Sequence, residues 1–150
     1  MAILGKDLLP NHGPYIDFVR RDTKLVYANG WPNPTLYKKD VVFLFADDLL
    51  GCVCSYTGKY CPFDPYELTQ LSQPHKLIEF ADTFLIWAMD VMRGDAAKAF
   101  DNFGWLNHYE GRKDLTGQQI QLDVSETLMH IAQLALDAAK SRGFLIIVGI

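Results

Sequence analysis

The clearest alternation of apolar and polar residues lies near the end of the chain. Apolar residues recur there at three- and four-residue steps, the spacing of one face of an α-helix. They are Leu128, Ile131, Ala132, Ala135 and Ala139. Asp123 and Glu126 have the spacing of a capping box, and Gly143 is a typical helix stop signal. We therefore predict a helix over about residues 126–142. The apolar run Phe144–Val148 then predicts a buried strand.

A second helical pattern precedes this one. Pro74 suits the first position of a helix and Gly94 its end, so we predict a helix over about residues 75–93. Its wide apolar face comprises Leu77, Ile78, Ala81, Phe84, Leu85, Ala88 and Met92. Asp95 is expected to cap a shorter helix that ends near Phe103.

Strand patterns stand out less clearly. Val41–Phe45 is apolar on both faces and predicts a central strand, with Leu49–Tyr56 as its antiparallel neighbour across a tight turn. Tyr15–Ala28 is ambiguous, because its first part fits one helical face while Lys24–Ala28 fits a strand. Tyr66–Leu71 is expected to form one helical turn.

These elements together predict an α+β fold. A small, mostly antiparallel sheet would be packed on one face by the two main helices, with a buried strand at the end of the sequence. The chain has 150 residues, 49% hydrophobic and 21% charged, and residues 1–150 are expected to form a single globular domain.

Charge and cysteine content narrow the class of protein. The formal net charge is −4, whereas a nucleic-acid-binding surface needs a basic stripe, so we predict no nucleic-acid partner. No apolar run reaches the roughly 20 residues of a membrane span, so we predict no membrane association. The cysteines are three and clustered, unlike an even disulfide framework, which favours a cytoplasmic protein.

Two acidic residues follow the strand Val41–Phe45. Carboxylates such as Asp47 and Asp48 at a strand end can hold a divalent metal, and His108 could then complete a small metal-dependent enzyme. Aspartate is also common in hairpin turns, which is the interpretation we favour. The enzyme stays the alternative hypothesis.

The cysteines offer a second metal hypothesis. Cys52 and Cys54 would point to the same face of a strand, and Cys61 and His75 could add further ligands to a tetrahedral zinc site. The paired spacing of a zinc knuckle is absent, however, and free cysteines are often buried. We therefore expect buried thiols and no bound metal or other cofactor.

Polar residues form stripes on both predicted helices. His75, Glu79 and Asp82 share one helical face, and Glu126, His130, Gln133 and Asp137 share another. Both stripes lie opposite the apolar faces, so we expect them to face solvent. The second stripe could alternatively form an interface.

Aromatic and polar residues gather in two segments without clear periodicity. The residues that are typical of binding hot spots there are Trp31, Trp105, His108, Tyr109 and Arg112. Plugging of the core edge is the simpler explanation for such aromatics. We nevertheless select them as the candidate binding surface.

These observations favour a non-catalytic binding protein that neutralises or sequesters another molecule. An immunity protein, or an inhibitor encoded by a bacterium or phage, fits the small size and mild acidity. A basic toxin or nuclease would be a suitable partner, because opposite charge accelerates association.

Overall fold

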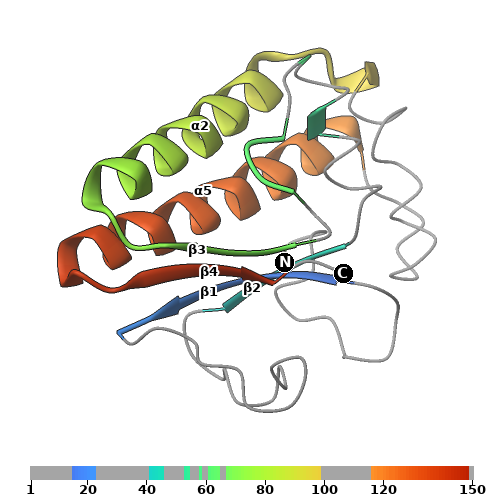
Figure 1. The fold of residues 1–150 in the computed structure, drawn as a ribbon. Helices are drawn as coiled ribbons and strands as arrows, with labels where there is room; N and C mark the ends of the chain where they lie inside the picture. Colours follow the sequence, from blue (N-terminus) through green and yellow to red (C-terminus); the bar gives the residue numbers. More distant parts are fainter. Residues whose placement is uncertain are drawn as a thin grey trace.

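The structure, a computed structural model, describes residues 15–22, 41–45, 53–54, 58, 61–64, 67–98 and 116–148. Its elements in chain order are β1 (Tyr15–Arg21), β2 (Val41–Phe45), β3 (Leu68–Leu71), α2 (Pro74–Arg93), α5 (Gly117–Ser141) and β4 (Phe144–Val148). The two helices lie side by side against one face of the sheet (Figure 1). This is the predicted α+β fold, with two main helices and a small antiparallel sheet.

The sheet has four strands in the order β2-β1-β4-β3, and every neighbouring pair is antiparallel. β1 occupies a central position, where Phe18 pairs with Val42 of β2 on one side and with Ile147 of β4 on the other. The segment whose pattern was ambiguous is therefore a strand over Tyr15–Arg21. β4 is the other central strand, and the prediction of a buried strand over Phe144–Val148 is confirmed.

Both faces of the central strands are buried. Phe18 and Ile147 belong to the main core, which also contains the buried faces of the helices. Val19 and Ile146 pair directly with each other on the opposite face, and each is only 1% exposed. Burial on both faces explains why β4 is a continuous apolar run and does not alternate with polar residues.

The start of α5 differs from the prediction. The helix begins at Gly117, because Thr116 and Gln119 form the capping box: Gln119 N–H donates to the Thr116 hydroxyl (3.2 Å), and the Gln119 side chain accepts from Thr116 N–H (2.8 Å). Asp123 lies inside the helix and is buried, so its predicted role as the cap is wrong. Both motifs have the same spacing, and the burial of Ile120 in the core favours the earlier start.

The end of α5 is a tight transition into β4. Arg142 adopts the left-handed conformation (φ 54°), and Gly143 N–H donates to the Ala138 carbonyl at 2.8 Å. A Cβ on Gly143 would lie 2.5 Å from the carbonyl oxygen of Arg21, closer than real Cβ contacts. Gly143 therefore allows the close approach that begins the pairing of β4 with β1.

α2 has the predicted bounds, with Pro74 at its start and Gly94 after its end. Its buried side carries an aromatic cluster that meets Phe18 of β1: ring centroids are 5.8 Å apart for Phe18–Phe84 and 4.6 Å for Phe80–Phe84. Trp87 is fully buried beside Phe84, and its indole N–H has no hydrogen-bond partner. Aromatic packing of this kind joins the helix to the sheet.

Three further sequence predictions differ from the structure. Val41–Phe45 was predicted to be a central strand, but β2 lies at an edge of the described sheet. Leu49–Tyr56 was expected to be a strand beside Val41–Phe45, but Val53 and Cys54 are helical and β2 pairs with β1. The predicted helical turn at Tyr66–Leu71 is also wrong, since Leu68–Leu71 is strand β3. In this last segment, pairing with the distant strand β4 outweighed the local pattern.

Asp95 caps a short helical segment over residues 96–98 as predicted, with its carboxylate accepting from Ala97 N–H at 2.7 Å. The expected end of that helix near Phe103 lies outside the described residues. None of the helices in the described part of the chain has both the length and the apolar character needed to cross a membrane.

Candidate functional site

Most residues that the sequence singled out for function lie outside the described residues. This applies to the binding candidates Trp31, Trp105, His108, Tyr109 and Arg112, and to the alternative catalytic or metal candidates Asp47, Asp48 and Cys52. Their roles remain predictions. The described residues bring together a different surface, which lies along the line where α2 and α5 meet.

Small residues form this line of contact. Ala81 and Ala88 on α2 and Ser125 and Ala132 on α5 are buried, and within each pair the residues are seven positions apart. Ser125 Oγ donates to the Ala88 carbonyl at 2.9 Å. Small side chains at this spacing allow two helices to pack closely along their length.

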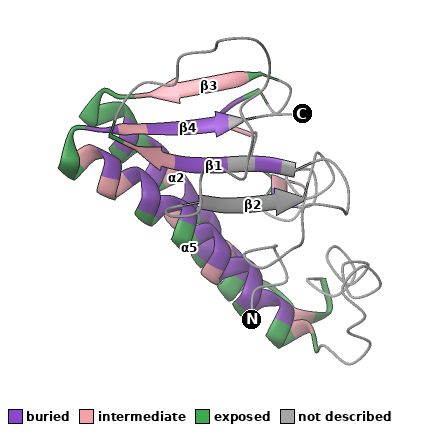
Figure 2. Cartoon of the chain, turned by 90° about the horizontal axis from the view of Figure 1, so that it is seen from below, coloured by how far each residue is buried: buried purple, intermediate pink, exposed green. Residues whose placement is uncertain are grey.

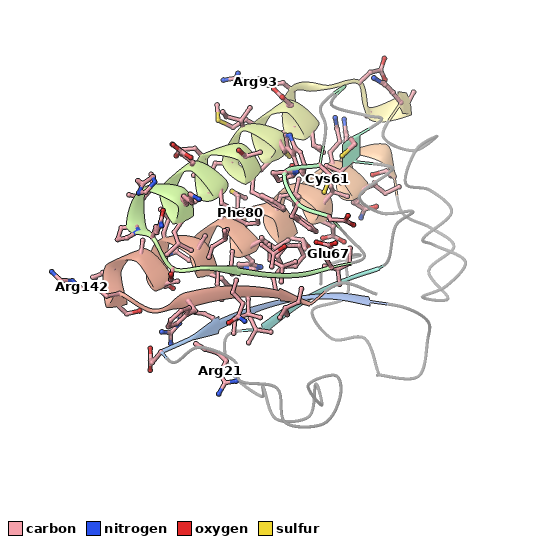
Figure 3. All side chains as sticks on the ribbon, viewed as in Figure 1. Arg21, Cys61, Glu67, Phe80, Arg93 and Arg142 are labelled. Carbon is pink, nitrogen blue, oxygen red and sulfur yellow. The ribbon has the colours of Figure 1, made fainter. Side chains whose placement is uncertain are left out.

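A buried glutamine fixes the relative direction of the two helices. Gln121 Nε2 donates to the carbonyls of Val91 (3.0 Å) and Gly94 (2.6 Å), at the end of α2. The start of α5 therefore lies beside the end of α2, and the helices are antiparallel. In Figure 3, Arg93 and Arg142 accordingly mark opposite ends of the helix pair.

Larger apolar residues border this contact line on its outer side. They occur at seven-residue steps on both helices, as Ile78, Leu85 and Met92 on α2 and as Leu122, Met129 and Leu136 on α5. We call these six residues the apolar seam. Leu85 and Leu136 are half-buried, whereas the other four are between 43% and 48% exposed. Figure 2 shows buried, intermediate and exposed residues following one another along both helices.

The exposure of Ile78 and Met92 corrects the predicted core face of α2. Both were assigned to its buried face, yet they are 45% and 48% exposed. The buried stripe is rotated toward the aromatic residues Phe80 and Trp87, because the sheet offers Phe18 and its neighbours as packing partners. α2 has more apolar surface than the sheet and α5 cover, and part of the excess lies on the seam.

The apolar area of the seam exceeds that of isolated surface residues. Four side chains at nearly half exposure, with two more partly exposed, present on the order of 300–400 Å² of apolar surface. A patch of that size is comparable to the largest apolar patch on a typical monomer, which is often functional. Met89, which is 48% exposed, extends the patch along α2.

Charged residues occupy equivalent positions beside the two rows. Asp82 lies four residues after Ile78 on α2, and Glu126 lies four residues after Leu122 on α5, so each acid borders its row. Basic residues lie at the two ends of the seam. Arg93 follows Met92 at the end of the α2 row, and Lys140 lies four residues after Leu136 at the end of the α5 row. The central part of the seam is therefore acidic at its borders.

The polar stripes lie where the sequence placed them. His75, Glu79 and Asp82 are all exposed on α2. On α5, His130 and Gln133 are exposed, and Gln133 Nε2 donates to Asp137 Oδ1 at 2.8 Å. Among the described residues, no three metal-ligating side chains come together.

Cys54 and Cys61 are half-buried free thiols, and Cys54 lies in a helical segment and not in the predicted strand, whereas Cys52 lies outside the described residues. Burial, together with the nearby Cys61, raises the pKa of the Cys54 thiol to about 11. Burial also raises the pKa of Cys61, whose Sγ donates to the Phe63 carbonyl at 3.0 Å.

The chain matches no protein-family model, no curated protein and no solved structure.

Proposed function

We propose that this protein is a non-catalytic binding protein that neutralises or sequesters another protein, and that the apolar seam is its contact surface. An immunity protein or an inhibitor encoded by a bacterium or phage acts in this way. The observation that carries the proposal is the exposure of Ile78, Met92, Leu122 and Met129 on the outer side of a well-packed helix pair. Apolar side chains that gather in one exposed patch are often part of an interaction surface.

The chemistry of the described residues supports a binding role. Hydrogen bonds of Gln121 and Ser125 hold α2 and α5 together, so the seam is presented by rigid elements. A preformed surface loses little conformational entropy when a partner docks. The net charge of −4 would accelerate association with a basic partner such as a toxin or nuclease.

We place this activity in the cytoplasm. Cys54 and Cys61 are free thiols, and thiols persist in a reducing compartment. The hot-spot candidates Trp105 and Arg112 would add to the contact surface, as the sequence predicts.

Affinity capture from a native lysate of the source organism tests the proposal. Three tagged proteins are compared: the wild type, Met129→Glu on the seam, and Ile86→Glu as a matched control. Ile86 is as exposed as the seam residues (48%) but lies on the side of α2 away from α5. Circular dichroism first establishes that both variants are folded.

The proposal predicts one stoichiometric protein in the wild-type and Ile86→Glu eluates and its loss with Met129→Glu. The captured protein should also lose its own activity when the wild type is added. Capture that is equal for all three proteins, or no capture at all, would overturn the proposed function of the seam.

A further inference from the structure

We infer that the seam receives an amphipathic α-helix with basic flanks, supplied by another protein. This inference rests on the proposed function and specifies the chemistry of the partner. Three properties of the seam support this inference: its length and repeat, the apolar character of its side chains, and the charged residues beside it.

The seam has the repeat of a helix-packing surface. Each row extends over fifteen residues, from Ile78 to Met92 and from Leu122 to Leu136, and its fourteen residue steps correspond to roughly 21 Å of helix. Two antiparallel rows with a seven-residue repeat match the spacing at which a third helix presents its own apolar residues. An occupying helix of about four turns would cover both rows.

The apolar character of the seam favours a helix over an extended peptide. A strand or loop laid on Leu85, Met129 and their neighbours would place its backbone N–H and C=O groups against apolar side chains. A helix satisfies these groups internally and offers only side chains to the surface. Methionines at Met92 and Met129 provide flexible side chains that adapt to the partner.

The acidic residues beside the two rows favour a partner helix that has basic residues on both sides of its apolar stripe. Asp82 borders the middle of the α2 row, and Glu126 borders the α5 row at a corresponding position. A helix lying between them would pair these carboxylates with lysine or arginine residues that flank its apolar stripe. Acidic flanks would meet like charge and be rejected.

The same acids disfavour a second copy of this chain as the occupant. A two-fold dimer formed through the seam would be isologous, so its middle would face the equivalent middle of the partner. Asp82 and Glu126 of the two copies would then be brought together, and the cations Arg93 and Lys140 would remain at the ends. A basic helix from another protein avoids this repulsion.

Binding of designed peptides to the full-length protein tests the inference. The probe is a fluorescent peptide of about three heptads with leucine at positions a and d and lysine at e and g. Its twin has glutamate in place of each lysine, and a scrambled lysine peptide removes the heptad while keeping the charge. Fluorescence anisotropy gives each Kd.

We expect the lysine peptide to bind at least tenfold more tightly than either control peptide. Met129→Glu should weaken its binding at least tenfold, whereas Ile86→Glu, which changes the net charge equally, should leave it unchanged. Asp82→Lys combined with Glu126→Lys should reverse the preference between the lysine and glutamate peptides.

Three outcomes would overturn the inference: equal binding of the lysine and glutamate peptides, equal effects of Met129→Glu and Ile86→Glu, or a wild-type dimer in sedimentation velocity that Met129→Glu dissociates. Different results would refute the proposed function and this inference. Capture of a partner that depends on the seam, without binding of either peptide, refutes only the basic helix. Peptide binding through the seam, without a captured partner, refutes only the neutralising role.

Discussion

Gln121 offers a direct test of how the helix pair is held together. It is 6% exposed, and its amide donates to the carbonyls of Val91 and Gly94 at the end of α2. Substitution by methionine keeps the length of the side chain and removes the donor. Val91 retains a second hydrogen bond from Gly94 N–H (3.3 Å), so the Gly94 carbonyl bears most of the loss.

The expected cost follows from these two hydrogen bonds. Each contributes roughly 0.5–1.5 kcal/mol to stability, so the loss of both costs about 1–3 kcal/mol. Burial of the methionine side chain offsets part of this loss. We expect Gln121→Met to lower the free energy of unfolding by about 2 kcal/mol, and the Tm by about 4–8 °C for a chain of this length.

Gln133→Met is the matched control, because it changes the same residue type on the same helix. Gln133 is exposed and makes a single hydrogen bond to Asp137, so its loss should cost only about 0.2–0.5 kcal/mol. Urea denaturation, followed by circular dichroism, gives both free energies. Equal losses in the two variants, or an unchanged midpoint for Gln121→Met, would refute the role assigned to the buried amide.

Two further predictions concern other parts of the fold. Gly143→Ala should destabilise the protein by about 2 kcal/mol or more in the same urea assay, because the new Cβ would meet the Arg21 carbonyl; unchanged stability would contradict this close approach. Cys54 should alkylate slowly at pH 8 and faster toward pH 11, since its pKa is raised from 9.0 to about 11. Because the pKa of Cys54 is higher in the folded than in the unfolded protein, the contribution of this thiol to stability should also fall between about pH 9 and pH 11. Pulsed alkylation with mass spectrometry measures the rate, and equal rates in native and urea-unfolded protein would refute the shift.

Local signals in the sequence located some elements well. α2 was predicted with nearly its observed bounds, because Pro74 and Gly94 mark its ends. β4 was predicted because an apolar run of that length suits only a buried strand. These elements need no information from distant residues, and the fold class followed from them.

Other elements depended on packing between distant residues. The start of α5 was missed because two motifs have capping-box spacing, and burial of Ile120 decides between them. β1 and β3 are strands because both pair with β4, far away in the sequence. A short segment such as Leu68–Leu71 has too little pattern of its own to show this.

The apolar seam could not be predicted from the sequence alone, for a related reason. Helical periodicity placed Ile78 and Met92 on an apolar face, but it could not show that α2 has more apolar surface than its neighbours cover. Seven-residue repeats on both helices were the available signal. Recognising them as one surface required the antiparallel register that Gln121 and Ser125 establish.

The place of β4 in the sheet also bears on how the protein is made. β1 and β3 pair with β4 and are separated by it in the strand order. During synthesis β1 leaves the ribosome early, whereas the strand that completes its pairing emerges after both helices. The apolar residues of β1 therefore lack this partner until β4 emerges, and contacts of such long sequence separation form slowly. Chaperone dependence and sensitivity to translation speed are the expected cellular consequences.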